Sequence, residues 1–412
     1  MRVRTAHLPT TVGTGETART FVRLMSFILH IRPCWRRYDG MTAQPALATP
    51  FSKRSGASRA GRDVQIGASQ LAEKDLQPAW SRQPTGSDEG RLAARQHRLN
   101  AMRASVETAT AAMAELASHR PALTAITIRQ DFVRLATWAS GEASDRRALP
   151  RHERPPATRL LSANGAALRL ILTALFEAHT AAGARAGTHP TNARPLLGTG
   201  PNDIGWVDLI ASPAQPATAG RSHMSTTAKR LRQLKEAIKT LHAGHLVDLP
   251  RQGAGGNKYE RFELLHEGGQ RRYGDPVPYL LPKTNEQDTL ALPLTVFTCG
   301  WIHVLEDTEL AVLLMRCSLG APTEVAEISA GERAMRYGMS RDAFDSYRVL
   351  ERVGILEVIR DPDRSPDGTI RAYSSGRHLA PPHQFRLLTD AFDASAFPLV
   401  HLAITGQPAV TA

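Results

Sequence analysis

The periodicity of hydrophobic and polar positions separates an irregular N-terminal stretch from a patterned remainder. Residues 1–88 are rich in Arg, Thr, Ser, Gly and Ala without a sustained period, which predicts disorder. In residues 89–118 apolar side chains recur near helical spacing, which predicts an amphipathic helix, and a second short helix is predicted over Ile128–Trp138. We therefore interpret 89–140 as a helical segment and 141–160 as a linker.

The clearest series of elements lies between residues 305 and 390. Ser329 with Glu332 three residues later forms a capping box, and Gly354 suits the left-handed position that ends a helix. In chain order we predict a helix capped by Asp307 or Thr308 and ended by Gly320, a helix over Ser329–Tyr337, a helix from Ser340 to Gly354, a strand at Ile355–Ile359, a polar loop at 361–376 and a strand at His383–Leu387.

This order predicts a winged helix-turn-helix domain over 301–395, followed by a tail at 396–412. The third helix of such a domain enters the major groove of DNA. Its open side carries Arg341 and Arg348, which could reach guanine edges or phosphates. The wing offers Arg364 and Arg371 to the DNA backbone.

A second, less distinct copy of the same order is predicted over 161–270, joined to the first by a linker at 271–300. A helix over Ala167–His179 is followed by a loop rich in Gly, Pro and Asn, and Ser225 or Thr226 caps a long helix that runs to Leu241. Strand-like stretches at 245–249 and 261–265 enclose a Gly-rich tip. The predicted fold class is therefore mainly α with small β-hairpin wings.

The charge is unevenly distributed, and the upstream copy carries most of the excess positive charge that could contact DNA. The chain has a formal net charge of +12, but residues 286–360 hold 7 basic and 12 acidic side chains. Arg is preferred over Lys and Ala is abundant, as in GC-rich coding sequence, so we discount the Arg excess alone. The helix after Ser225 holds one acid and five basic residues, and with the tip it supplies the candidate DNA contacts Lys229, Arg230, Arg232, Lys235, Lys239 and Lys258. The alternative interpretation is an ordinary solvated basic face.

Taken together, the two copies resemble the tandem winged-helix DNA-binding proteins that include plasmid replication initiators. The segment Gly300–Leu310 is also similar to part of uncharacterised actinobacterial proteins with this layout. The resemblance covers roughly residues 160–400. It implies a partner of double-stranded DNA and a role as transcriptional regulator or replication initiator, with a homodimer expected if one copy serves dimerisation.

Motifs for catalysis and metal binding are not found, so we predict a non-enzyme without cofactor or metal. No HExxH, G-x-S-x-G, CxxC or nucleotide-binding fingerprint is present. The three cysteines have no redox or metal spacing, which favours a reduced, cytoplasmic protein. The apolar stretch Phe21–Ile31 is too short to span a bilayer, so no membrane partner is expected. The alternative function is a protein-interaction scaffold that uses winged helices for dimerisation or partner binding.

Overall fold

The computed structural model describes the chain from residue 86 onward, with gaps. The predicted wing, with Arg364 and Arg371, and nearly all of the segment 1–88 lie outside the described residues. The described ranges are 86–139, 148–162, 165–200, 203–213, 224–251, 253, 255–272, 274–283, 286–360 and 382–406.

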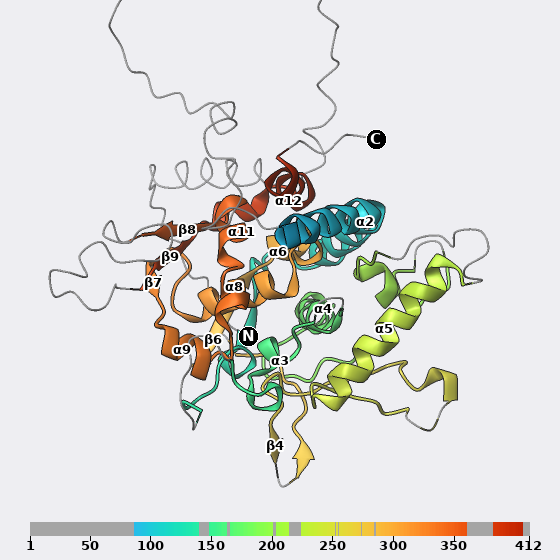
Figure 1. The fold of residues 1–412 in the computed structure, drawn as a ribbon. Coiled ribbons are helices and arrows are strands. Elements are labelled where there is room, and N and C mark those ends of the chain that lie inside the picture. Colours follow the sequence, from blue (N-terminus) through green and yellow to red (C-terminus); the bar gives the residue numbers. More distant parts are fainter. Residues whose placement is uncertain are drawn as a thin grey trace, which may run out of the picture. The chain divides into compact units, whose positions relative to one another are not determined.

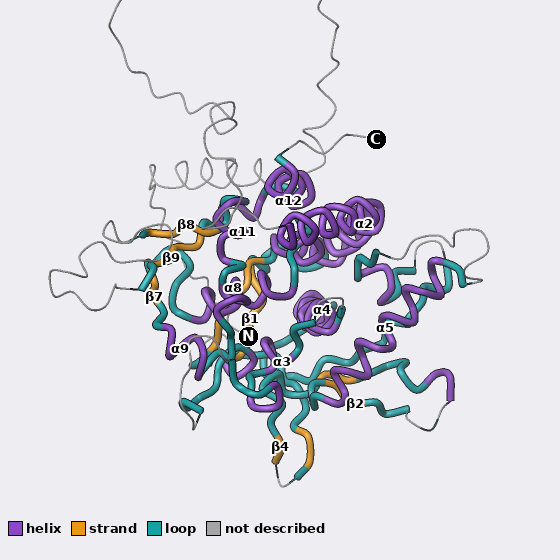
Figure 2. Tube along the Cα trace, in the orientation of Figure 1, coloured by secondary structure: helices purple, strands orange, loops and turns teal. Residues whose placement is uncertain are grey.

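The described chain combines helices with small antiparallel sheets (Figure 1). Its strands are short, and helices and loops make up most of the described chain (Figure 2). The helices are α2 (Gly86–Ser118), α3 (Pro156–Arg159), α4 (Ala167–Thr180), α5 (Thr226–Ala243), α6 (Thr295–Thr298), α7 (Trp301–Val304), α8 (Asp307–Ser318), α9 (Ala330–Met335), α10 (Arg341–Phe344), α11 (Tyr347–Arg352) and α12 (Ala396–Thr405). The strands are β1 (Ala125–Arg129), β2 (Val247–Asp248), β3 (Glu263–Leu264), β4 (Arg271–Arg272), β5 (Asp275–Pro276), β6 (Thr289–Pro293), β7 (Ala326–Glu327), β8 (Leu356–Ile359) and β9 (Gln384–Leu387).

The N-terminal part of this fold confirms one predicted helix and corrects another. Helix α2 covers the predicted helix 89–118 and buries Leu99, Met102 and Val106. The helix predicted over Ile128–Trp138 is wrong, because β1 and a short 3-10 turn occupy its first half. Strand β1 pairs antiparallel with β6, some 160 residues later in the chain, and this distant partner leaves no signal in local periodicity.

Helix α4 lies in the middle of the described chain (Figure 1). All of its residues except Arg169 and Glu177 are buried, and it packs against α5, β1 and α2. Glu177 has an ion-pair partner in Arg194, at 3.4 Å. A helix that is apolar on all sides needs cover on all sides, so α4 organises the elements around it.

The two stretches predicted as linkers contribute to the core. Helix α3, within 141–160, buries Ala157 and Thr158. Within 271–300, β6 pairs with β1, and Phe297 of α6 stacks on Phe176 of α4 with ring centroids 4.7 Å apart. The buried apolar side chains form one continuous cluster from α2 to α12.

Downstream, the predicted helices and strands are present, but one helix is divided, and β7, α7 and, in the stretch predicted as a tail, α12 are additional elements. Ser329 caps α9 by accepting a hydrogen bond from Glu332, as predicted. The single helix predicted after Ser340 is instead α10 and α11, separated at Asp345–Ser346. Asp and Ser favour helix ends, and here the Ser346 hydroxyl donates to Thr308 at 2.8 Å. An unpredicted strand, β7, joins a three-stranded sheet of order β7-β9-β8.

A buried ion pair joins α2 to the start of α8. Arg95 donates through both terminal nitrogens to the Glu309 carboxylate, at 2.5 and 2.7 Å, and both residues are buried. Glu309 also accepts from the Glu306 backbone N–H at 2.9 Å, which completes a capping box. Burial favours the neutral carboxyl and raises the pKa of Glu309, although Arg95 acts in the opposite direction.

Removing one partner of this pair is expected to be costly, because the other charge stays buried without compensation. Arg95→Gln should lower the free energy of unfolding by about 3–5 kcal/mol in urea denaturation. Arg103→Gln is the control on the same helix, since Arg103 pairs with the exposed Glu107 and stands over the Phe397 ring, 5.8 Å from its centroid, and the expected cost is about 1 kcal/mol. Equal effects of the two substitutions would contradict a structural role for the buried pair.

Candidate nucleic-acid interface

Helix α5 begins at the cap predicted for it and ends at a glycine. The Ser225 hydroxyl accepts a hydrogen bond from the Ala228 N–H at 3.1 Å, and Gly244 stands at the C-terminal cap. Leu234, Ile238 and Leu241 are buried on its inner side, as the sequence pattern predicts. These contacts hold α5 against α4 and the 3-10 turn Trp206–Leu209.

The basic residues of α5 divide between an outer face and one flank. Arg232 and Lys239 are exposed, while Lys229 and Lys235 are half-buried. Arg230 points instead toward the 3-10 turn, where its guanidinium donates to the Val207 carbonyl at 2.6 Å. The structure therefore brings the predicted residues of α5 onto one helix but directs Arg230 inward.

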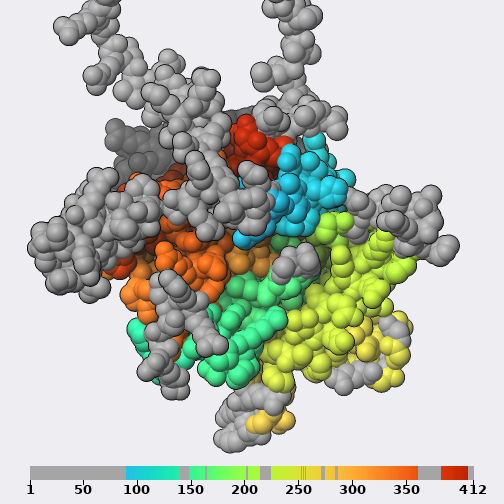
Figure 3. All heavy atoms as spheres, in the orientation of Figure 1, coloured from blue at the N-terminus to red at the C-terminus, as the bar shows by residue number. Residues whose placement is uncertain are grey.

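The hairpin after α5 adds a further cation close in sequence to the helix. Strands β2 and β3 pair antiparallel, and the turn Gly255–Asn257 lies between them. The Lys258 amine stands over the Tyr259 ring, 4.8 Å from its centroid. Figure 3 shows the surface of α5 and of the hairpin region side by side, in yellow-green to yellow.

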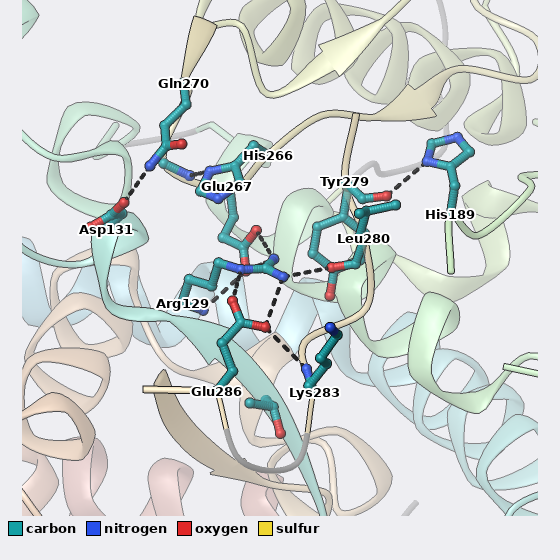
Figure 4. Close-up of polar contacts among 12 residues, drawn as sticks. Arg129, Asp131, His189, His266, Glu267, Gln270, Tyr279, Leu280, Lys283 and Glu286 are labelled. Carbon is teal, nitrogen blue, oxygen red and sulfur yellow. Dashed lines mark hydrogen bonds and ion pairs between the residues drawn. The ribbon is translucent and has the colours of Figure 1, made fainter. Parts of the chain in front are cut away.

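A polar network around Arg129 holds the chain that follows the hairpin β2–β3 (Figure 4). The Arg129 guanidinium bonds Glu267 at 2.9 Å, Glu286 at 2.5 Å and the Leu280 carbonyl at 3.0 Å. Glu267 is fully buried, and the Arg129 backbone N–H also donates to it at 3.0 Å. Arg129 therefore ties β1 to the chain that leads away from β3.

Sequence reasoning missed this network, because its members come from three segments with separate assignments, a predicted helix, the upstream copy and a linker. Tyr279 lies under Arg129, with the guanidinium carbon 5.8 Å from the ring centroid. Burial raises the pKa of Tyr279 well above its usual value. The adjoining pair, Gln270 with Asp131 at 2.6 Å, makes the same connection between the segments. The Arg129 guanidinium is fully engaged by the two carboxylates and the Leu280 carbonyl, so we assign the network a positioning role.

The other predicted DNA-contacting residues lie in a different region. Arg341 is exposed in the first turn of α10, after the cap formed by Ser340. Arg348 is half-buried, stands over the Tyr347 ring and faces Asp345 at 4.0 Å. In Figure 1, α11, which carries Arg348, lies left of centre and α5 lies at the right. The structure does not bring the two predicted sets together into one site.

Comparison of the chain with models of known families, with curated proteins and with solved structures finds no match. The described residues contain no cluster of three or more His, Cys, Asp or Glu side chains placed to hold a metal ion. Within the same residues, no helix has the length and apolar character needed to cross a membrane. The basis for assigning a function to α5 is therefore its own charges and geometry.

Three polar side chains, Arg169, His303 and Asp307, lie near the first turn of α4. Arg169 donates to the Leu305 carbonyl at 2.9 Å and faces Asp307 at 3.8 Å. Burial raises the pKa of Asp307 to about 6, although Arg169 lowers it. The ring of His303 is fully buried, and neither of its nitrogens has a hydrogen-bond partner in the described part of the chain. Burial, with a smaller effect of Arg169, lowers the pKa of His303 to about 3.

His303 should therefore make folding sensitive to acid. Its pKa falls from 6.5 to about 3 on folding, so below pH 6.5 the unfolded chain takes up a proton that the native chain does not. The loss of unfolding free energy should reach about 2 kcal/mol at pH 5. His303→Leu should remove this loss in urea denaturation at pH 7 and pH 5.

Asp307 acts in the opposite sense, because its raised pKa favours the native chain as pH falls through 6 toward 3.8. The difference between His303→Leu and the parent chain isolates the histidine from this effect. His152→Leu serves as the control, since His152 is exposed, with 82% of its side chain accessible. An unchanged pH dependence in His303→Leu would show that His303 does not set the acid sensitivity.

Proposed function

We propose that the chain binds double-stranded DNA, with the phosphate backbone contacted mainly by α5 and the hairpin that follows it. The observation that carries this proposal is the charge of α5, which has five basic residues and one acid on a helix of 18 residues. The acid, Glu236, faces Lys239 at 3.9 Å and is largely exposed. Clustered Lys and Arg side chains on an open helix are what phosphate neutralisation requires.

The order of elements supports tandem winged helices as the framework for this function. Downstream, helix α8 is followed by β7, α9, α10 with α11, β8 and β9, and the sheet order is β7-β9-β8. Upstream, α4 is followed by a 3-10 turn, α5, β2 and β3. In a winged helix the last helix before the hairpin enters the major groove, which gives α5 that position in the upstream copy.

We propose a role as transcriptional regulator or plasmid-type replication initiator. Both require specific DNA sites, and both use paired DNA-binding modules. The upstream copy would supply phosphate contact. The downstream copy would supply sequence preference through Arg341, which lies in the exposed first turn of α10.

A second candidate function, a scaffold for protein contacts, is favoured by the local pairing in the downstream copy. Arg348 faces Asp345 on the next turn, and Arg360 bonds Glu351 through both terminal nitrogens at 2.5 Å. Cations that are already paired with neighbouring acids are poorer ligands for phosphate. On this account the downstream copy serves dimerisation while α5 binds DNA.

Loss of the outer lysines of α5 should weaken DNA binding regardless of sequence. In fluorescence anisotropy with labelled duplexes, Lys235→Ala combined with Lys239→Ala should lower affinity for all of them. The slope of log affinity against log salt concentration should fall by about 2, or about one for each phosphate contact. Far-ultraviolet circular dichroism should be unchanged, because neither side chain belongs to the buried face.

The matched control removes two cations elsewhere, by Arg103→Ala with Arg185→Ala, and should leave the salt slope unchanged. Equal losses in the two double variants would indicate attraction by net charge alone. Failure of the parent chain to retain any duplex between about 50 and 200 mM salt would rule out the proposal.

The role of the downstream copy can be tested separately through Arg341. If this copy reads DNA, Arg341→Ala should change preference at one base position by about 1–3 kcal/mol, measured by competition among duplexes that differ at single positions. Asp342→Ala, at the neighbouring exposed position, is the control for local change in α10. Unaltered affinity and preference in Arg341→Ala would assign this copy to protein contact.

A further inference from the structure

A cavity of about 300 Å³ lies between α5 and the first turn of α4. The stretch Val207–Pro213 forms another wall, and Arg151 reaches it from the segment before α3. The size is at the lower end of the range for small-molecule sites in proteins. The cavity follows the flank of α5 that carries Arg230, between its buried side and its outer basic face.

Four arginines converge on this cavity, and their charges are only partly offset. Arg151, Arg169, Arg230 and Arg232 line it, against a single carboxylate, Glu236, which also faces Lys239. Like charges gathered around one space repel each other, and an anion within it would relieve the repulsion. The lining is therefore suited to a ligand with more than one negative charge.

Three of these guanidinium groups donate to neutral backbone carbonyls, and of the three only Arg169 also faces a carboxylate among the described residues, that of Asp307 at 3.8 Å. Arg151 donates to the Arg159 carbonyl at 2.8 Å, Arg169 to Leu305 at 2.9 Å and Arg230 to Val207 at 2.6 Å. The carbonyl bonds orient Arg151 and Arg230 without neutralising them and leave other donors for a ligand. Burial lowers the pKa of Arg230, and Asp208 offsets this only in part.

Unused donors remain at this site. The Nε atoms of Arg169 and Arg230 are buried and have no hydrogen-bond partner among the described residues. The first turn of α4 also opens on the cavity, and its cap residue, Ala166, has no side-chain oxygen to bond the backbone N–H groups there. Backbone N–H groups at a helix start, together with arginines, bind phosphate in many proteins.

The rest of the lining is apolar, with two uncharged polar side chains. Leu160, Val207, Ile210 and Leu234 contribute apolar surface, while Ser212 and Gln233 bond each other and add polar groups. A bare inorganic anion would leave this apolar wall without contacts. A small organic molecule that carries a phosphate would use both parts of the cavity.

We propose that this cavity is a binding site for a small phosphomonoester, with the phosphate held by Arg151, Arg169 and Arg230. The inference does not rest on the proposed DNA binding, because Arg151 and Arg169 lie outside α5, and of the exposed basic residues of α5 only Arg232 also lines the cavity. DNA could supply the same phosphate chemistry from its backbone, and the experiment must therefore separate the two sources.

The test uses the full chain and isothermal titration calorimetry with ribose 5-phosphate, with ribose as the uncharged comparison. Ribose 5-phosphate should bind at one site per chain and ribose should not. Arg151→Gln should weaken binding about tenfold, as expected for the loss of one charged hydrogen bond. Arg151 is exposed and outside α5, so this variant should fold normally and retain the parent's affinity for duplex DNA.

Lys239→Gln is the matched control, since it removes one cation from α5 outside the cavity lining. It should leave the affinity for ribose 5-phosphate unchanged.

Absence of saturable ribose 5-phosphate binding, or equal weakening by Arg151→Gln and Lys239→Gln, would overturn the proposal. Loss of duplex binding in Arg151→Gln without any binding of ribose 5-phosphate would also overturn it and would assign the arginines to the DNA backbone. Failure of duplex binding alone would bear only on the function proposed for α5.

Discussion

The burial of α4 is the constraint on which the remaining structure depends. Its apolar residues face every direction, so α2, α5 and β1 must all pack around it. Each fully buried Leu, Ile or Phe side chain contributes about 1.5–3 kcal/mol relative to exposure. The two residues of α4 that are not buried are both charged and both engaged, Arg169 by the Leu305 carbonyl and Asp307, and Glu177 by Arg194. A helix of this kind gives neighbouring elements a fixed surface to lie on.

Two consequences for the candidate sites follow from this arrangement. Helix α5 rests on α4 through Leu234, Ile238 and Leu241, and this contact leaves Arg232 and Lys239 exposed. The start of α4 stands beside the same helix, so that Arg169 and Arg230 approach one space from two elements. The outer face and the cavity therefore arise from a single packing contact. The ion pair of Arg95 with Glu309 holds α2 in place over this core.

The sequence predicted the local features well, because caps and helical periodicity are encoded by neighbouring residues. Ser225, Ser329 and Gly354 stand where helix ends were predicted. The pairing of β1 with β6 could not be predicted, since it joins residues about 160 positions apart and Ile128 fits a helical or a strand pattern equally well. The cavity was missed for the same reason. Its arginines come from three separated segments, and only folding reveals that Arg230 points inward while Lys239 points outward.

Two binding roles are proposed for α5, one for DNA on its outer lysines and one for a phosphomonoester in the cavity. The parts of the helix that carry these roles are anchored differently. Its buried side chains begin at Leu234, and the first two turns, which include Arg230 and Arg232, have none. Those turns are held instead by the Ser225 cap and by the bond from Arg230 to Val207. An anion that bridged Arg230 to Arg151 and Arg169 would add contacts where the apolar packing consists of the partly buried Leu231. The half of α5 that carries Lys235 and Lys239 already has buried apolar side chains, so ligand binding in the cavity would order the start of the helix more than its outer lysines.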